Sequence, residues 1–210
     1  MALKLNIAVF ASGTGSNFKA ILEAIKSGSI RNAKVVVVIS NNSDAGALAI
    51  ARDHGLPGLQ INRKQFESDE AFTTAILNAL HTYRTNFIVL AGYMKKIDPL
   101  IIRNFRNRIV NIHPALLPSF GGKGMYGMRV HEAVIASKAA LSGATVHIVD
   151  EEYDHGRIVL QKKVPVDPQD TPETLALRVL NIEHEIYPEA IRLIAEGQID
   201  LDAGQVSGVN

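Results

Sequence analysis

A regular alternation of strand-like and helix-like segments limits the possible folds of this chain more than any other feature. The expected strands are short apolar runs, many of them β-branched, at 6–10, 35–39, 59–61, 87–92 and 108–112. Helical patterns lie between and after them, near 16–26, 45–54, 68–83, 99–103 and 130–137. Strands that alternate with helices are typical of a parallel sheet covered on both faces. We therefore predict an α/β fold with a doubly wound, mostly parallel sheet.

Beyond residue 142 the pattern changes to two alternating runs, 143–149 and 157–166, joined by the acidic segment 150–156. Apolar and polar residues that alternate over this length predict strands. The short connection between them predicts that the two strands are antiparallel. We expect them to form a ribbon at the edge of the sheet.

A long terminal helix is expected after these strands. Thr171 has the residue type of an N-cap, and Pro172 suits the first turn. Pro188 should kink or split the helix, because proline removes one backbone hydrogen bond. No linker, repeat or low-complexity tract divides the chain. We therefore expect one domain over 1–200 and a loose tail over 201–210.

The composition is ordinary for a soluble protein. Of the 210 residues, 47% are apolar and 20% are charged, and the net charge of +1 indicates no nucleic-acid or membrane partner. The absence of cysteine excludes disulfides, cysteine-based zinc sites and a thiol nucleophile. No apolar run approaches the roughly 18 residues of a membrane span, and the first residues suit a strand better than a signal peptide. We expect a cytoplasmic location.

The candidate catalytic residues are Asn111, His113 and Asp154. Asn111 and His113 are two apart at the end of an expected strand, so their side chains should project from the same face. Asp154 lies in an Asp-His-Gly turn, and a carboxylate beside His113 should raise the pKa of that imidazole. An amide, an imidazole and a carboxylate together suit acyl transfer, as oxyanion donors and a proton carrier. Taken singly, such residues are also typical of plain turns.

A glycine-rich loop follows the first expected strand and opens the first expected helix at Gly15 and Ser16. Exposed N–H groups at a helix N-terminus suit a phosphate, although a tight strand-to-helix turn explains the glycines equally well. A dinucleotide site would place a third glycine where Phe18 stands and an acid after the second strand, which instead ends in Ser40 and Asn41. No Walker lysine follows. A phosphate monoester therefore fits better than a nucleotide cofactor.

With these features together, the chain resembles the phosphoribosylglycinamide formyltransferases, a folate-dependent family of purine biosynthesis. The resemblance covers roughly residues 5–195 and is carried by four motifs, Ser12–Asn17, Leu90–Met94, Asn111–Pro118, and Gly143–His147 through Asp154–Gly156. Each motif is short, but the four in this order and spacing are highly specific. The resemblance implies a Rossmann-like formyltransferase fold.

The resemblance also implies a reaction, the transfer of a formyl group from the co-substrate 10-formyltetrahydrofolate to the amine of glycinamide ribonucleotide. No metal is required. The implied catalytic residues are Asn111, His113 and Asp154. The implied substrate-binding residues are Gly15, Ser16 and Asn17 at the phosphate and Glu183 near the ribose. The implied folate-binding residues are Met94, Lys95, Lys96, Ile97, Asn111, Asp150 and Asp154. His147 could lie behind the catalytic residues or be an ordinary core histidine.

Three departures from the family's usual pattern concern the rim of the site. The loop 120–127 is longer than in some relatives, Lys95 and Lys96 replace an arginine–hydrophobe pair, and Asp69 stands where some relatives carry arginine. Lys95 or Lys96 could bind the acidic tail of the folate, or both could simply be solvated. We expect a monomer or a homodimer.

Two enzymes with a similar Asn/His/Asp core are rivals, formyltetrahydrofolate hydrolase and methionyl-tRNA formyltransferase. The first usually carries an additional domain ahead of the catalytic one, and the second carries a basic β-barrel after it. Chain length and a near-zero net charge favour neither. A nicotinamide-dependent dehydrogenase would explain the glycine loop but not the trio. A non-catalytic folate- or nucleotide-binding module would keep the pocket without turnover.

Overall fold

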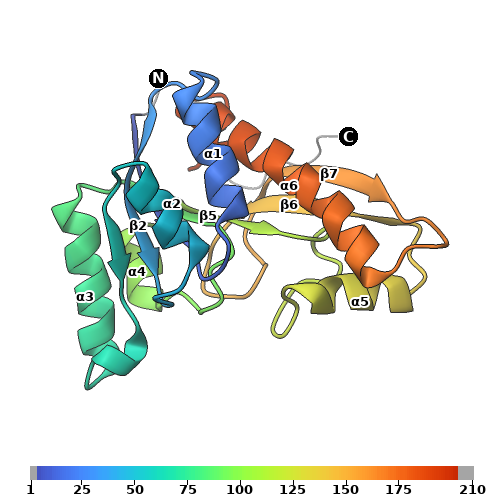
Figure 1. Ribbon diagram of the computed structural model, residues 1–210, viewed down its shortest axis with the longest axis horizontal. Helices are drawn as coiled ribbons and strands as arrows, with labels where there is room; N and C mark the ends of the chain where they lie inside the picture. The colour runs from blue at the N-terminus through green and yellow to red at the C-terminus, as the bar shows by residue number, and fades with distance from the viewer. Residues whose placement is uncertain (1–3, 203–210) are drawn as a thin grey trace.

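The computed structural model describes residues 4–202, and Figure 1 shows their arrangement. Seven strands form one sheet in the order β3-β2-β1-β4-β5-β6-β7. The strands are β1 Leu5–Phe10, β2 Ala33–Ser40, β3 Gly58–Gln60, β4 Phe87–Leu90, β5 Ile109–His113, β6 Leu141–Ile148 and β7 Ile158–Pro165. The helices are α1 Ser16–Lys26, α2 Gly46–Asp53, α3 Asp69–Thr82, α4 Pro99–Asn104, α5 Met128–Ala136 and α6 Pro172–Ala195, with a 3-10 turn η1 at Arg63–Gln65.

The sheet has a parallel and an antiparallel part. Strands β1 to β5 are parallel to one another, while β6 runs antiparallel to both β5 and β7. The predicted fold class is therefore confirmed. The antiparallel ribbon is more deeply integrated than an edge ribbon, because β6 lies inside the sheet between β5 and β7 and is buried along nearly its whole length.

Two apolar cores cover the two faces of the sheet, as the period of two along a strand requires. Along β1, Ile7 and Val9 pack with helices α1, α2, α5 and α6, whereas Ala8 and Phe10 pack with α3 and α4. Helices α1 and α6 lie side by side over the first face (Figure 1). Strands β1, β2, β4 and β5 are thus largely buried on both sides, which explains their unbroken apolar runs in the sequence, whereas the edge strand β3 is mostly exposed.

The chain changes direction across the sheet between β1 and β4, which are neighbours although β2 and β3 come between them in sequence. The loops after β1 and β4 therefore start side by side at the carboxyl edge of the sheet. Such a position is where open α/β sheets place their ligands. Backbone contact between the two loops begins at once, since the Ser12 N–H donates to the Gly92 carbonyl at 3.0 Å.

Helix α6 begins as predicted and passes through Pro188 without a break. The Thr174 N–H donates to the Thr171 side chain at 3.3 Å, which confirms the N-cap. Of the predicted kink or split at Pro188, the split is wrong, because α6 is one continuous helix over Pro172–Ala195. Buried residues on both sides of the proline, among them Tyr187 and Ile191, anchor the two halves to the same core. Burial of each large side chain is worth about 1.5–3 kcal/mol, so together they outweigh one lost helical hydrogen bond.

Packing extends two residues into the expected tail. Leu201 is only 3% exposed, and Asp202 pairs with Arg108 at 2.7 Å. The remainder of that tail, 203–210, lies outside the described residues. No helix in the part of the chain from 4 to 202 is long and apolar enough to cross a membrane.

Candidate active site

Strands β5 and β6 bring together the polar side chains at the centre of the candidate site. Asn111 and His113 lie two apart on β5, and their cross-strand partners on β6 are His147 and Thr145. The pleat therefore places all four residues on one face. Asn111 Nδ2 lies 3.2 Å from His147 Nε2. His147 Nδ1 is protonated, because it lies 3.0 Å from the Ile148 carbonyl, which can only accept.

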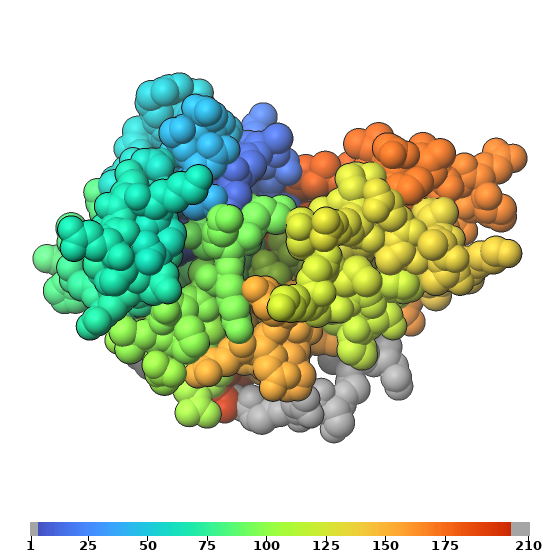
Figure 2. Space-filling view, turned by 90° about the horizontal axis from the view of Figure 1, so that it is seen from below, coloured from blue at the N-terminus to red at the C-terminus, as the bar shows by residue number. Residues whose placement is uncertain are grey.

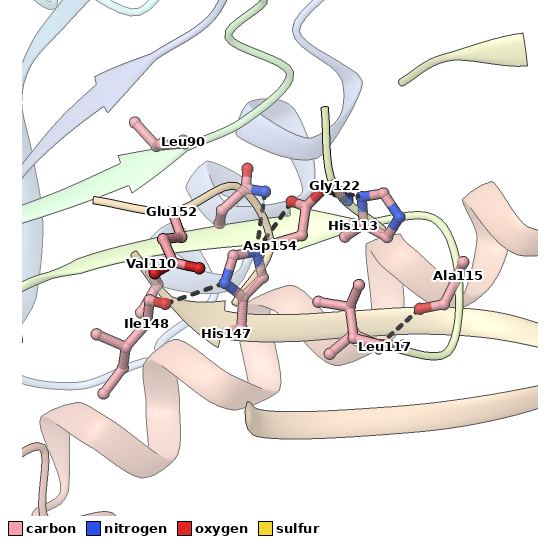
Figure 3. Close-up of polar contacts among 12 residues, drawn as sticks. Leu90, Val110, His113, Ala115, Leu117, Gly122, His147, Ile148, Glu152 and Asp154 are labelled. Atoms are coloured by element: carbon pink, nitrogen blue, oxygen red, sulfur yellow. Dashed lines mark hydrogen bonds and ion pairs between the residues drawn. The ribbon is translucent and has the colours of Figure 1, made fainter. Parts of the chain in front are cut away.

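Asp154 reaches this face from the loop that follows β6 (Figure 3). Its Oδ2 atom lies 3.6 Å from His113 Nδ1, and its Oδ1 atom lies 3.6 Å from His147 Nε2. These separations exceed a hydrogen bond and are electrostatic contacts. The direct hydrogen bond comes from the Gly122 N–H, which donates to Oδ2 at 2.9 Å. One carboxylate thus lies between two imidazoles.

The loop holds Asp154 there by a tight return onto β6. Asp154 itself has φ 54°, which a non-glycine residue adopts only at some cost. At Gly156 a side chain has no room, since an added Cβ would lie 1.8 Å from the Ile148 carbonyl oxygen. The Asp-His-Gly turn is therefore a structural requirement of the loop as well as the source of the carboxylate.

Both nitrogens of His113 face protein groups. The Nε2–H donates to the Phe120 carbonyl at 2.8 Å, and Nδ1 faces Asp154. Burial lowers the pKa of His113 by more than Asp154 and the Phe120 carbonyl raise it. Asp154 raises the pKa of His113 as predicted, but the expectation that this favours the charged imidazole is wrong, because desolvation of the ring is the larger effect.

The pKa of Asp154 shifts below its ordinary value. Burial raises it, but His147, His113 and the Gly122 N–H lower it by more. At neutral pH the centre therefore consists of a carboxylate flanked by imidazoles, of which His113 is held in its neutral form. In this arrangement the Asp154 carboxylate can accept a proton while the neighbouring side chains keep their positions.

Two residues that sequence reasoning missed hold the loop after His113. Thr145 donates its hydroxyl to the Ala115 carbonyl at 2.6 Å and accepts from the Leu117 N–H at 3.1 Å. Gln161 on β7 donates to both Leu117 O and Thr145 Oγ1. The alternation of Thr145 with His147 was a usable signal for the first, whereas nothing local marks Gln161.

The N-terminus of α1 forms the second part of the site. Gly15 is its N-cap in the left-handed conformation, with φ 79°, and no side chain caps the helix. The first N–H groups, including those of Ser16 and Asn17, are therefore free to bind an anion. A Cβ on Gly15 would lie 2.8 Å from the Ala47 Cα, so the same glycine also allows α2 to pack closely.

Glu183 on α6 meets this helix N-terminus. Asn17 Nδ2 donates to Glu183 Oε2 at 2.6 Å, and both side chains are buried. Burial raises the pKa of Glu183 to about 7, although the Asn17 hydrogen bond lowers it. Within residues 4–202, the buried Asn17 Oδ1 has no hydrogen-bond partner. Four residues predicted at the substrate, namely Gly15, Ser16, Asn17 and Glu183, are thus brought together.

The segments predicted to line a folate pocket form the third part. Lys96 lies over the Tyr153 ring, 5.1 Å from its centroid, so the 94–97 loop meets the 150–154 loop. Met94 is 55% exposed, Ile97 is buried in the core, and Lys95 is exposed. Asp150 accepts from the Glu152 N–H and pairs with His155 at 2.8 Å. In Figure 2 these green and orange segments face the yellow segment that carries the 120–127 loop.

Tyr187 on α6 links strands β4 and β5, whose following residues belong to different parts of the candidate site. Its hydroxyl lies 2.9 Å from the carbonyl of Leu90, the last residue of β4, and 3.1 Å from the carbonyl of Val110 on the neighbouring strand β5. Tyr187 is fully buried one helical turn after Glu183. Among residues 4–202 there is no group of three or more His, Asp or Glu side chains placed to hold a metal ion.

The fold and this site define the class of protein: a doubly wound α/β protein with an Asn/His/Asp cluster at the carboxyl edge of its sheet. The sequence pattern of the formyl transferase family matches residues 5–191. The chain therefore belongs to the formyl transferase family.

Individual relatives agree with this assignment. The chain is 47% identical over 193 residues to the chloroplastic phosphoribosylglycinamide formyltransferase of Vigna unguiculata, covering 92% of this chain and 62% of that protein. Glycinamide ribonucleotide transformylase 1 from Symbiobacterium toebii superposes with TM-score 0.86 at 41% identity, covering 92% of this chain and 88% of that one. Phosphoribosylglycinamide formyltransferase from Brucella melitensis gives TM-score 0.84 at 39% identity, with 98% and 100% covered.

Proposed function

We propose that this protein transfers the formyl group of 10-formyltetrahydrofolate to the amine of N1-(5-phosphoribosyl)glycinamide, a step of purine biosynthesis. The products are formylglycinamide ribonucleotide and tetrahydrofolate. One observation carries the proposal: the Asp154 carboxylate lies between two imidazoles beside Asn111, in a chain whose relatives are phosphoribosylglycinamide formyltransferases.

In the proposed step the acceptor nitrogen attacks the formyl carbon, and the carbonyl oxygen becomes an oxyanion. The free N–H of Asn111 stabilises that oxyanion, an effect typically worth about 10²–10³ in rate. Collapse breaks the bond from the formyl carbon to the folate nitrogen. The acceptor nitrogen loses a proton to Asp154, directly or through water, and the folate nitrogen gains one.

His113 has two proposed tasks. Its unprotonated Nδ1 faces Asp154, so it can take over the proton that the carboxylate receives. Its Nε2–H is held by the Phe120 carbonyl, so donation to a substrate oxyanion requires that bond to open. The loop that begins at Phe120 therefore controls whether His113 acts on the substrate directly.

Substrate positions follow from the other two parts of the site. The phosphate is proposed at the N–H groups of Gly15, Ser16 and Asn17, with Glu183 at the ribose hydroxyls. The folate is proposed between the 94–97 loop and the Asp150–Asp154 segment. Lys95 or Lys96 would meet its acidic tail. His147 is proposed to lie behind Asn111, whose amide it contacts.

The remaining proposals concern the protein as a whole. The scheme needs no metal, nucleic acid or membrane partner. A single domain, 1–200, with a short tail, 201–210, is proposed to act in the cytoplasm as a monomer or homodimer. The chain spans 62% of the length of the Vigna unguiculata relative.

An absorbance assay with and without the acceptor tests the proposal. We expect purified protein to consume 10-formyltetrahydrofolate only when glycinamide ribonucleotide is present. Consumption without the ribonucleotide would identify a hydrolase. Binding of both compounds with no turnover would identify a non-catalytic module, and reduction of a nicotinamide cofactor would contradict formyl transfer altogether.

A further inference from the structure

Ser12 lies where the ends of three strands meet, and the proposed reaction gives it no task. It belongs to the loop between β1 and α1, and the neighbours of β1 in the sheet are β2 and β4. Asn41 and Asn42 follow β2, at the position where a dinucleotide-binding strand would carry an acid. Those two amides also have no task in the proposed reaction.

Four hydrogen bonds join Ser12 to the residues that follow β2 and β4. Toward β4, its N–H donates to the Gly92 carbonyl at 3.0 Å, and its Oγ accepts from the Met94 N–H at 2.9 Å. Toward β2, its hydroxyl donates to Asn41 Oδ1 at 2.5 Å, and its carbonyl accepts a longer bond from Asn42 Nδ2 at 3.4 Å. The hydroxyl is therefore a donor on one side and an acceptor on the other, which uses its single proton.

Asn41 is itself held from the next strand. The backbone carbonyl of Asn41 accepts from Asn62 Nδ2 at 2.6 Å, and Asn62 follows β3 as the N-cap of η1. The network thus links the carboxyl ends of β1, β2, β3 and β4. Ser12 is the member that touches Met94 and leads directly into the Gly15 turn, so it joins the second and third parts of the candidate site.

We propose that Ser12 is a positioning residue that fixes the two substrate sites relative to each other. The proposal rests on the proposed function, in which a phosphate binds at Gly15 and a folate binds beside Met94. Each substrate contacts mainly its own loop, so the affinity for one substrate alone does not depend on Ser12. The reaction rate does depend on Ser12, because the amine and the formyl carbon must meet at about 3–3.5 Å. A misplacement of about 1 Å lowers the rate by about 10²-fold.

Ser12→Ala is the direct test, and Ser12→Thr is the matched control that keeps the hydroxyl. For Ser12→Ala we expect kcat to fall by about tenfold or more. Dissociation constants for glycinamide ribonucleotide alone and for tetrahydrofolate alone should stay within about twofold of the wild-type values. The Met94 amide should exchange faster with solvent, because it has lost its acceptor. Ser12→Thr should restore both the rate and the slow exchange.

Two outcomes would overturn the proposal: an unchanged kcat in Ser12→Ala, or a loss of affinity for each single substrate that matches the loss of kcat. If Ser12→Ala does not fold, Asn41→Ala removes the acceptor of the hydroxyl instead, and it should likewise lower kcat while leaving both single-substrate dissociation constants unchanged. A wild-type protein without turnover would contradict the proposed function by itself. Hydrogen exchange of the Met94 amide would then test the role of Ser12. An unchanged exchange rate in Ser12→Ala would show that Ser12 does not position this loop.

Discussion

The two ends of the candidate site present different kinds of chemical group, backbone groups at one end and side chains at the other. At the α1 end the groups that face a ligand are backbone N–H groups, shaped by the left-handed turn at Gly15. At the β5–β6 end they are the side chains of Asn111, His113, His147 and Asp154. The first end therefore depends on backbone shape, and the second depends on which atoms carry protons.

Sheet topology explains the difference. A parallel strand leads through a short loop into a helix, so the carboxyl edge of the parallel part presents helix N-termini. An antiparallel pair instead places residues directly opposite each other, as it does Asn111 and His147. The sheet changes from one type to the other between β5 and β6. Anchoring and chemistry are thus separated along one edge.

The largest effect is expected at the side-chain end. Asp154→Asn should lower kcat by at least about 10²-fold, because the amide cannot accept the proton. The fold should persist, since the amide oxygen can still accept from the Gly122 N–H. Steady-state kinetics measure kcat, and circular dichroism checks that the fold persists. Asp53→Asn, the same substitution at an exposed position on α2 outside the proposed site, is the control and should keep wild-type rates.

Glu183 hydrogen-bonds Asn17 at the α1 end, and its contribution to stability should depend on pH. Its pKa rises from 4.5 to about 7 on folding, so it stabilises the fold fully below pH 4.5 and loses that effect as the pH rises through about 7. Glu183→Gln removes the buried charge. It should be more stable than wild type at pH 8 by up to about 3 kcal/mol, and equally stable near pH 4.

Denaturant unfolding at the two pH values measures this difference. Glu185→Gln is the matched control, because Glu185 is an exposed carboxylate on the same helix. Equal stability differences for Glu183→Gln at both pH values would show that folding does not raise the pKa of Glu183, and so that Glu183 is charged at pH 8 in the folded protein.

The smallest expected effect is at the backbone end. Gly15→Ala should lower the free energy of unfolding by about 1–3 kcal/mol, because alanine resists the left-handed conformation and its Cβ would lie 2.8 Å from Ala47 Cα. The KM for the ribonucleotide should rise more than kcat falls. Gly13→Ala is the control, since a Cβ there meets nothing within 4 Å. A larger loss in kcat than in KM would mean that the two ends are not separate.

Local pattern was sufficient for much of the fold and part of the site. Alternating runs predicted the parallel sheet, and the spacing of two between Asn111 and His113 predicted that they share a face. The Gly15 turn was marked by its glycine. In each case the property depends on the residue and its immediate neighbours.

Other features depend on partners far away in the sequence. Asn17 and Glu183 are 166 residues apart, and Ser12 reaches Met94 across 82. The Phe120 carbonyl on His113 and the Gln161 bonds to Leu117 belong to the same kind. No local pattern specifies such contacts, because they exist only after distant elements have packed.

The sequence by itself determined the strand and helix rhythm, the same-face pair on β5 and the helix N-terminus at Gly15, since these follow from backbone periodicity and residue type. Tertiary structure decided the protonation of the site and the course of α6. Burial lowered the pKa of His113 against the pull of Asp154, and core packing carried the helix through Pro188. Desolvation and packing depend on everything that surrounds a group, so they emerge only when the whole domain has folded.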